Sequence, residues 1–197
     1  MSAEELKTAF LEAPDGEGLV RLYAALCAEG IDDQVAPILD KVRPIQHRVT
    51  LVQADASREL LEALCRDPHP HVRQVVAAHA HVSEEVCLRL CEDQQAPVRM
   101  ALRKNPRCHR VIKGALVQRE RNDHTWEHLV EAVWHARRAG LDEDALTALV
   151  ADWTQVDPDD FAALTGEQVS LVMEVLRAKL GHGPMPRKPR KSRKRKR

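Results

Sequence analysis

The sequence predicts an all-α fold: a short α-solenoid with helical caps and a disordered basic C-terminal tail. Aromatic residues make up only 3% of the chain, and Ala, Leu, Val, Glu and Arg recur in runs with little Gly, which favours helices over a β-sandwich. A repeat of 26 residues occupies the middle of the chain, and a segment rich in Arg and Lys ends it. No run of about 18 apolar residues occurs, so we predict no membrane span.

Three helices are predicted before the repeat. Ser2 and Glu5 have the spacing of a capping box, so the first helix begins there. Residues 14–16, which read Pro-Asp-Gly, interrupt that helix. The second helix covers about residues 17–29 and stops at the glycine that follows, and the third covers about residues 32–42.

The repeat is visible when residues 46–71 are set against residues 72–97, with no gap between the two rows. A third unit begins at Val98. The best matched pairs are Val49 and Val75, Ala54 and Ala80, Ser57 and Ser83, Glu59 and Glu85, Leu64 and Leu90, Cys65 and Cys91, and Asp67 and Asp93.

Each unit carries the signals of two short helices. The first helix covers residues 72–78 in one unit and 98–104 in the next. The second begins after Ser57 or Ser83, whose hydroxyl can cap it, and it ends before a proline, because the residue before proline disfavours helix. Neither helix can bury its apolar face alone, so the units are expected to stack as a solenoid.

This pattern resembles the leucine-rich repeat variant, a repeat related in architecture to HEAT repeats. The resemblance rests on Val-Arg at the start of a unit, as at residues 72–73, and on Asp-Pro-x-Pro in the connection at residues 67–70. Residues 105–106 match the Asn-Pro that is usual in that connection, whereas the other two units depart from it. The resemblance covers about residues 44–120 and implies an α-solenoid, but no activity.

Some proteins with this repeat carry an iron–sulfur domain before it. The corresponding region here has one cysteine, Cys27, which is too few for four-thiolate ligation within one chain. We therefore predict no cofactor.

Further helices are predicted after the repeat. An amphipathic helix covers about residues 123–139, and Asp142 caps another that ends near residue 153. A turn or short helix follows at residues 158–164, and Thr165 with Gln168 forms a capping box for the last helix, which ends near residue 181. The predicted domains are an N-terminal cap over residues 1–43, a repeat solenoid over 44–121, a helical region over 122–182 and a disordered tail over 183–197.

Charge is strongly segregated although the formal net charge is zero. Residues 1–98 carry 9 basic and 17 acidic residues, and residues 122–176 carry 2 and 12. The basic island, residues 99–121, carries 8 basic residues and 1 acidic residue, and the basic tail, residues 187–197, carries 9 and none. Such asymmetry points to partners of opposite charge.

The basic island and the basic tail form the predicted nucleic-acid interface. A dense polycation attracts phosphate backbones through counterion release. Island residues that break the repeat pattern are better suited to phosphate contact than to a structural role. HEAT-like proteins that bind DNA hold the duplex on a basic concave face, which is a further resemblance. The predicted nucleic-acid-binding residues are Arg103, Lys104, Arg107, Arg110, Lys113, Arg187, Lys188, Arg190, Lys191, Arg193, Lys194, Arg195, Lys196 and Arg197.

Other interpretations of these charges stay open. The tail could bind anionic lipid surfaces, or it could lie on the chain's own acidic helices at residues 142–160. Arg73 and Arg99 recur at the repeat period, so we expect them to pair with acidic residues such as Asp67 and Asp93 in neighbouring loops. The solenoid could also be a scaffold that holds a protein partner.

A zinc site is a further alternative. Cys87 and Cys91 share one face of a predicted helix, and His79 and His81 lie shortly before them. Cys91, however, aligns with Cys65 in the repeat, which makes it a core position where Cys acts as a small apolar residue. We predict no metal.

No motif of a phosphate-binding loop, a nucleophile elbow or a zinc peptidase occurs, so we predict no enzyme. A lower alternative is a HEAT-like DNA glycosylase, with Asp123 or Asp152 as the carboxylate and Trp126, Trp134 and Trp153 as aromatic residues. The simpler interpretation is that Trp126 and Trp134, eight residues apart on one helix, are core residues that pack the C-terminal cap against the last repeat.

The sequence thus predicts a non-catalytic protein that binds DNA or RNA, with a protein partner as the alternative. Five cysteines, an odd number, and an N-terminus without a basic and then apolar signal indicate reduced thiols and a cytoplasmic location. Arg outnumbers Lys by 16 to 5 over residues 1–186, which is compatible with a GC-rich bacterial genome.

Overall fold

The structure is a computed structural model of the 197-residue chain that describes residues 2–31, 34–54, 56–121 and 124–187. All regular structure in these ranges is helical, which confirms the predicted all-α class, and none of the helices there is long and apolar enough to cross a bilayer. Contacts divide the chain into two compact units, Met1–Cys108 and His109–Arg197.

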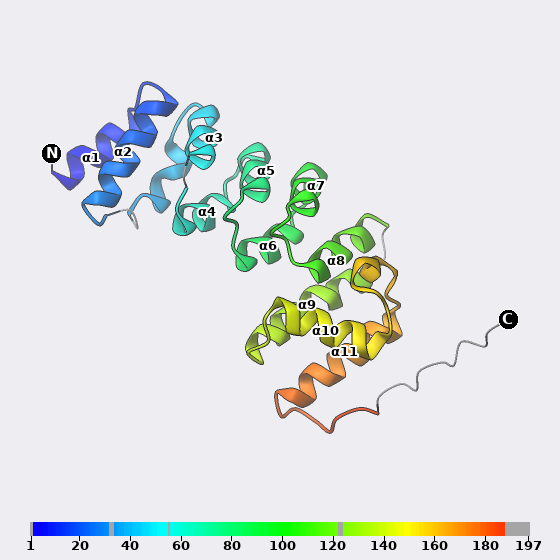
Figure 1. Ribbon diagram of the computed structural model, residues 1–197. Coiled ribbons are helices and arrows are strands. Elements are labelled where there is room, and N and C mark those ends of the chain that lie inside the picture. The colour runs from blue at the N-terminus through cyan, green and yellow to red at the C-terminus, as the bar shows by residue number, and fades with distance from the viewer. Residues whose placement is uncertain (1, 32–33, 55, 122–123, 188–197) are drawn as a thin grey trace. The chain divides into compact units, whose positions relative to one another are not determined.

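The first unit contains two rows of short helices (Figure 1). α3, α5 and α7 form one row, in which α5 packs against both neighbours, and α4 and α6 form the other. The helices of this unit are α1 (Ala3–Leu11), α2 (Gly16–Ala28), η2 (Ala36–Lys41), α3 (Ile45–Gln53), α4 (Arg58–Leu64), α5 (Pro70–Ala78), α6 (Glu84–Cys91) and α7 (Ala96–Lys104).

Helix starts in the first unit follow the predicted caps. Ser2 and Glu5 form both hydrogen bonds of a capping box. The hydroxyls of Ser57 and Ser83 accept hydrogen bonds from the third backbone N–H of α4 and α6, at 3.2 and 3.3 Å. α2 begins directly after the Pro-Asp pair, and the glycine after it, Gly30, has a φ of +68° that favours Gly.

The predicted helix over residues 32–42 is confirmed only in part. The segment contains a six-residue 3-10 helix, Ala36–Lys41, and residues 32–33 lie outside the described ranges. Pro37 lies in its first turn, and Pro44 keeps Arg43 out of the helical conformation. The six residues of this segment form about two turns of 3-10 helix, a type that is usually short.

An arginine recurs along the row of α3, α5 and α7, and we call Arg48, Arg73 and Arg99 the arginine series. Arg48 donates to both carboxylate oxygens of Asp67, at 2.7 and 3.0 Å, and its third nitrogen donates to the Val42 carbonyl at 2.6 Å. Both side chains are buried, with exposed fractions of 0% and 1%. Because each of the three guanidinium nitrogens of Arg48 donates a hydrogen bond, the buried side chain joins the Val42 carbonyl to the loop that carries Asp67.

The next member of the series repeats these contacts. Arg73 donates to the Asp93 carboxylate at 2.6 and 3.2 Å and to the Asp67 carbonyl at 2.7 Å. The predicted pairing of Arg73 with an acidic residue in a neighbouring loop is therefore confirmed. Each carbonyl acceptor lies six residues before its arginine, so Arg73 ties two successive loops together.

The structural register differs by one residue from the ungapped sequence alignment. That alignment sets His47 against Arg73, whereas the contacts make Arg48 the equivalent residue. The reason is a shorter loop in the first repeat, where three residues separate the end of α3 from the cap Ser57, whereas four separate the end of α5 from Ser83.

We expect the Arg73–Asp93 pair to make the first unit sensitive to acid. Burial of the Asp93 carboxyl opposes its ionisation, but hydrogen bonds from Arg73 and from the Gln95 N–H outweigh that effect and lower its pKa. Because the folded-state pKa lies below the unfolded one, the stabilisation is complete above about pH 4 to 5 and is lost as the pH falls through the folded value. Chemical unfolding of wild type and Asp93→Asn should therefore differ most at neutral pH and converge toward pH 2. The exposed neighbour change Glu92→Gln is the control, and a pH-independent difference for Asp93→Asn would contradict this account.

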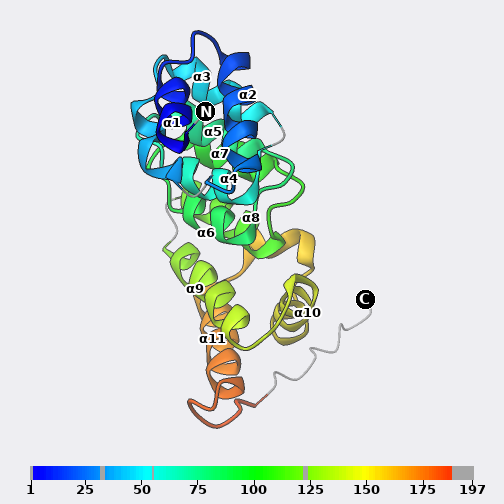
Figure 2. The same cartoon turned by 90° about the vertical axis from the view of Figure 1, so that its left-hand side faces the viewer.

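The second unit consists of longer helices. α9 lies beside α11, as Figures 1 and 2 show, and α8 packs against α9 and η3. Gly114 of α8 allows that approach, because a Cβ there would lie 3.0–3.2 Å from Phe161 atoms. The elements are α8 (Arg110–Glu120), α9 (Thr125–Arg138), α10 (Glu143–Thr154), η3 (Pro158–Ala163) and α11 (Gly166–Lys179).

Caps in the second unit also follow the prediction. The Asp142 carboxylate accepts from the Ala145 N–H at 2.8 Å, and Thr165 with Gln168 forms a complete capping box. α9 ends two residues before Gly140, whose φ is +72°. Residues 184–187 have no regular structure.

Candidate nucleic-acid interface

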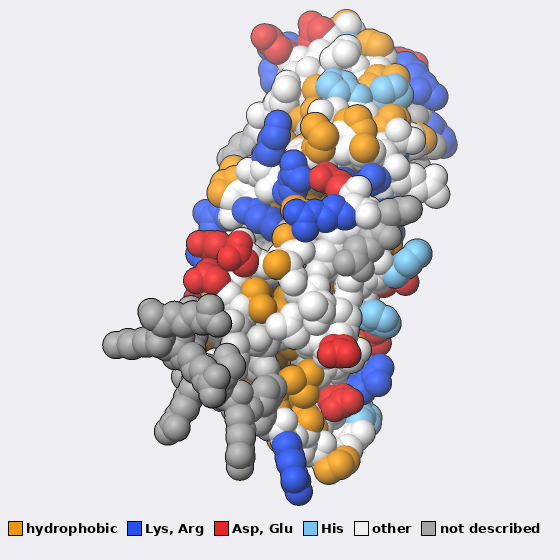
Figure 3. Space-filling model, turned by 90° about the vertical axis from the view of Figure 1, so that its right-hand side faces the viewer, with side chains coloured by type: hydrophobic (Ala, Val, Ile, Leu, Met, Phe, Trp, Pro, Cys, Tyr) orange, Lys and Arg blue, Asp and Glu red, His pale blue; other side chains and the backbone are white. Residues whose placement is uncertain are grey.

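The basic island is divided between the two units. Arg103 and Lys104 lie in the last turn of α7, and Arg107 follows in the connection, all within the first unit. Arg110 and Lys113 lie on α8 in the second unit. Figure 3 shows exposed Lys and Arg side chains together with exposed apolar ones on one face.

α7 presents its cations because its apolar positions face inward. Val98 and Leu102 are fully buried, whereas Lys104 is exposed and Arg103 half-buried. Basic residues in the last turn also interact favourably with the helix C-terminus, which is a local reason for their position.

The connection after α7 is held by Asn105. Its buried side chain donates to the carbonyls of Ala77 and His79, at 2.8 and 2.9 Å, and accepts from the Arg107 N–H at 2.9 Å. The bonds to Ala77 and His79 join the connection to the end of α5, and the bond from the Arg107 N–H lies within the connection. Lys104 and Arg107 therefore flank a fixed point of the backbone. In the sequence, Asn105 stands out only through the family resemblance. Its contact with Ala77 joins residues 28 positions apart, so no nearby residue pattern predicts it.

Lys104 and Arg107 are exposed, and within residues 2–31, 34–54, 56–121 and 124–187 neither side chain forms an ion pair. Their charge is therefore balanced by solvent counterions, which a polyanion can replace. These two residues are the part of the predicted interface best disposed for phosphate contact.

Arg110 has a different environment. Its guanidinium lies 3.2 Å from the Asp159 carboxylate, and its backbone N–H donates to Glu143 at 3.3 Å. The predicted phosphate contact of Arg110 would compete with carboxylates of its own unit. Lys113 is half-buried on the same helix.

Arg99 departs from the rest of the arginine series. One guanidinium nitrogen donates to the Asp93 and Gln94 carbonyls, at 2.7 and 2.9 Å. Its buried Nε has no hydrogen-bond partner in the part of the chain that the structure describes. The predicted pairing of Arg99 with Asp93 is thus a bond to the backbone carbonyl and not to the carboxylate.

The tail lies almost wholly outside the described residues. Arg187 is exposed. The remaining predicted tail contacts lie outside those residues: Lys188, Arg190, Lys191, Arg193, Lys194, Arg195, Lys196 and Arg197.

The cysteine and histidine positions of the zinc alternative have structural roles. Cys87 and Cys91 are buried in the core of α6, as the repeat alignment predicts. His79 Nδ1 accepts a hydrogen bond from the His81 N–H at 3.2 Å, and the two rings lie 5.6 Å apart. No group of three or more potential metal ligands is present among the residues described.

The aromatic residues of the glycosylase alternative do not share one environment. Trp134 is 40% exposed, so the prediction that it packs in the core is wrong. Trp126 is half-buried under the Arg119 guanidinium, whose carbon lies 4.5 Å from the ring centroid. Asp152 is exposed on α10, and Asp123 lies outside the described residues.

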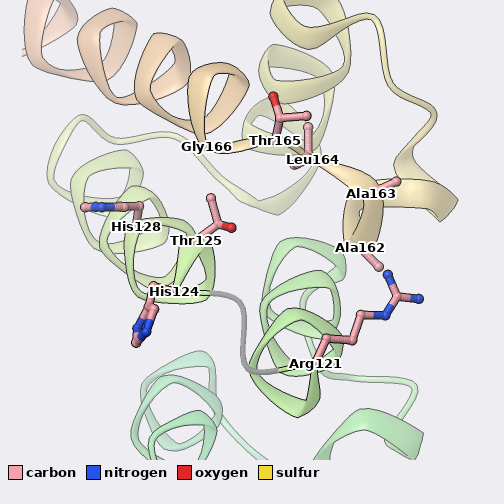
Figure 4. A pocket seen from close by; sticks show the side chains of 9 residues that line it. All are labelled: Arg121, His124, Thr125, His128, Ala162, Ala163, Leu164, Thr165 and Gly166. Atoms are coloured by element: carbon pink, nitrogen blue, oxygen red, sulfur yellow. The ribbon is translucent and has the colours of Figure 1, made fainter.

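The second unit also has an open hollow of about 640 Å³ between α8, α9 and the start of α11 (Figure 4). Arg121 extends toward Ala162, while the His124 and His128 rings point away from it. Catalysis requires titratable groups that converge on one point, and these side chains do not converge. The lining residues are Arg121, His124, Thr125, His128, Ala162, Ala163, Leu164, Thr165 and Gly166.

No protein-family model matches the chain, and neither does any curated protein or solved structure.

Proposed function

We propose that this protein binds DNA or RNA through phosphate contacts and catalyses no reaction. The observation that carries the proposal is the pair Lys104 and Arg107, two exposed cations without ion pairs in the described ranges, beside a backbone that Asn105 holds. Because the backbone between them is already held, phosphate binding would have to order only the two side chains. The basic tail adds attraction that depends on charge rather than on sequence.

We propose that the frame is a short α-solenoid of HEAT-like, leucine-rich repeat variant units. Support comes from the rows of α3, α5 and α7 and of α4 and α6 in Figure 1, and from the recurring contacts of Arg48 and Arg73. In such a frame each unit contacts mainly its neighbours, so successive loops project on one side at a regular spacing.

A protein-binding scaffold is the second candidate. The observation in its favour is Met100 on α7, a large apolar side chain that is 44% exposed. A partner held by such contacts would bind with little dependence on salt, whereas phosphate contacts weaken steeply with salt.

The five cysteines are free thiols, and we infer a reducing, cytoplasmic compartment from them.

We expect the double change Lys104→Glu and Arg107→Glu to weaken binding of duplex DNA and of structured RNA. Each lost phosphate contact should reduce the slope of log K against log salt by about 0.7–0.9, so the slope of the double variant should fall by about 1.4–1.8. Fluorescence anisotropy over a salt series measures this slope. Truncation before Arg187 removes nine cations and should reduce the slope further.

The matched control is Arg21→Glu with Arg66→Glu, which makes the same change in net charge at exposed positions of the first unit. If both double variants lose the same affinity, net charge and not the 104–107 site governs binding. If wild type binds neither nucleic acid at low salt, the proposed function fails.

A further inference from the structure

α9 carries a tryptophan that is only partly covered by the fold. Trp134 is 40% exposed, while Leu129 and Val133 of the same helix are fully buried. Full burial of a tryptophan covers roughly 150–250 Å² of mostly apolar surface, so a side chain that is 40% exposed keeps part of that surface available to a partner.

The charge around Trp134 is unlike that of the surrounding segment. Residues 122–176 contain 12 acidic residues and only two basic ones, Arg137 and Arg138. Both arginines are exposed and follow Trp134 by three and four residues, which places them next to it on the helix surface. The guanidinium carbon of Arg137 lies 6.0 Å from the centre of the Trp134 ring.

The nearest acidic side chain on this side of α9 already has partners. Glu131, one turn before Trp134, is 3.6 Å from the Arg177 guanidinium and 3.3 Å from a His135 ring nitrogen. Glu127, two turns before, is exposed. The immediate surroundings of the indole ring thus favour an anion more than the composition of residues 122–176 suggests.

An indole ring beside arginines can hold an unpaired base and the phosphate attached to it. Every base has a π-face, so stacking on Trp tolerates any sequence, and a guanidinium can contact the phosphate. Bases within a duplex already stack on one another and are not accessible to Trp. We propose that Trp134 stacks on an unpaired base of single-stranded nucleic acid while Arg138 contacts its phosphate. The inference rests on the proposed function and adds that single strands are a preferred ligand.

The test compares Trp134→Ala with wild type against single-stranded oligothymidine and against a blunt-ended DNA duplex of the same total charge. We expect Trp134→Ala to bind oligothymidine about ten-fold more weakly and the duplex with unchanged affinity. Trp134→Phe keeps an aromatic face and should retain most of the affinity. Met100→Ala removes another exposed apolar side chain and should change neither value.

Fluorescence gives a second readout that a structural role would not move. Oligothymidine should quench wild-type tryptophan emission, and Trp134→Phe should abolish most of that quenching although Trp126 and Trp153 remain. Equal loss of affinity for both ligands in Trp134→Ala, or no loss for either, overturns the inference while the proposed function stands. Unchanged affinity would point to a protein partner, because Trp and Arg also dominate protein interfaces. Failure of wild type to bind both ligands would instead overturn the proposed function.

Discussion

Replacing Asp67 with Ala lowers the free energy of unfolding by about 3–5 kcal/mol, as expected when one side of a buried ion pair is removed. The Asp67 carboxylate accepts two hydrogen bonds from Arg48 and one from the His69 N–H at 2.8 Å. Without it, the Arg48 guanidinium keeps its charge in a site with an exposed fraction of 0%. Chemical unfolding at neutral pH, followed by far-UV circular dichroism, measures the loss.

Two further variants separate the buried charge from general effects of substitution. Glu62→Ala breaks the exposed Arg58–Glu62 pair, which has a similar distance of 2.8 Å, and should cost far less because water screens it. The double change Arg48→Met with Asp67→Leu replaces the pair by apolar groups and should recover much of the lost stability. A loss in Asp67→Ala no greater than that in Glu62→Ala would show that the pair contributes little.

The second large effect is expected for Asn105→Ala, which should lower the free energy of unfolding by about 2–4 kcal/mol. The change leaves the carbonyls of Ala77 and His79 without their side-chain donor, and it frees the Arg107 N–H. Because these bonds hold the connection that carries Arg107, affinity for duplex DNA should fall as well. Chemical unfolding and anisotropy on the same preparations measure the two quantities.

Asn105→Asp is the informative companion. It keeps the shape of the side chain but sets a carboxylate oxygen against two carbonyl oxygens, so we expect it to destabilise at least as much as Ala. Gln95→Ala, at an exposed cap position whose side chain makes no capping bond, should have little effect. Stability close to wild type in Asn105→Asp would mean that the two carbonyls do not depend on Asn105.

The helix boundaries could be predicted from the sequence because the interactions that set them are local. The caps at Ser2, Ser57, Ser83 and Thr165 join residues only three positions apart, so the pattern of residues contains both partners. The buried Cys91 was likewise predictable, since apolar spacing within one helix defines the inward face.

Contacts between distant residues were not predictable from these patterns. A loop that is shorter by one residue moves Arg48, rather than His47, into position for Asp67, and no local signal shows that shift. Arg110 meets Asp159 across 49 positions of the chain, which changes its availability for phosphate. The sequence does show that Arg137 and Arg138, the two basic residues of the segment 122–176, follow Trp134 by three and four positions.

The all-α class, the helix caps, the repeat and the segregation of charge can all be predicted from the amino-acid order, because each depends on residues close together in the chain. The burial of Arg48, the exposure of Lys104 and Arg107 beside Asn105, and the partial exposure of Trp134 depend on how the helices pack. Burial depends on which surfaces other elements cover. Helical periodicity defines the faces of a helix, but only packing selects which of them meets a neighbour.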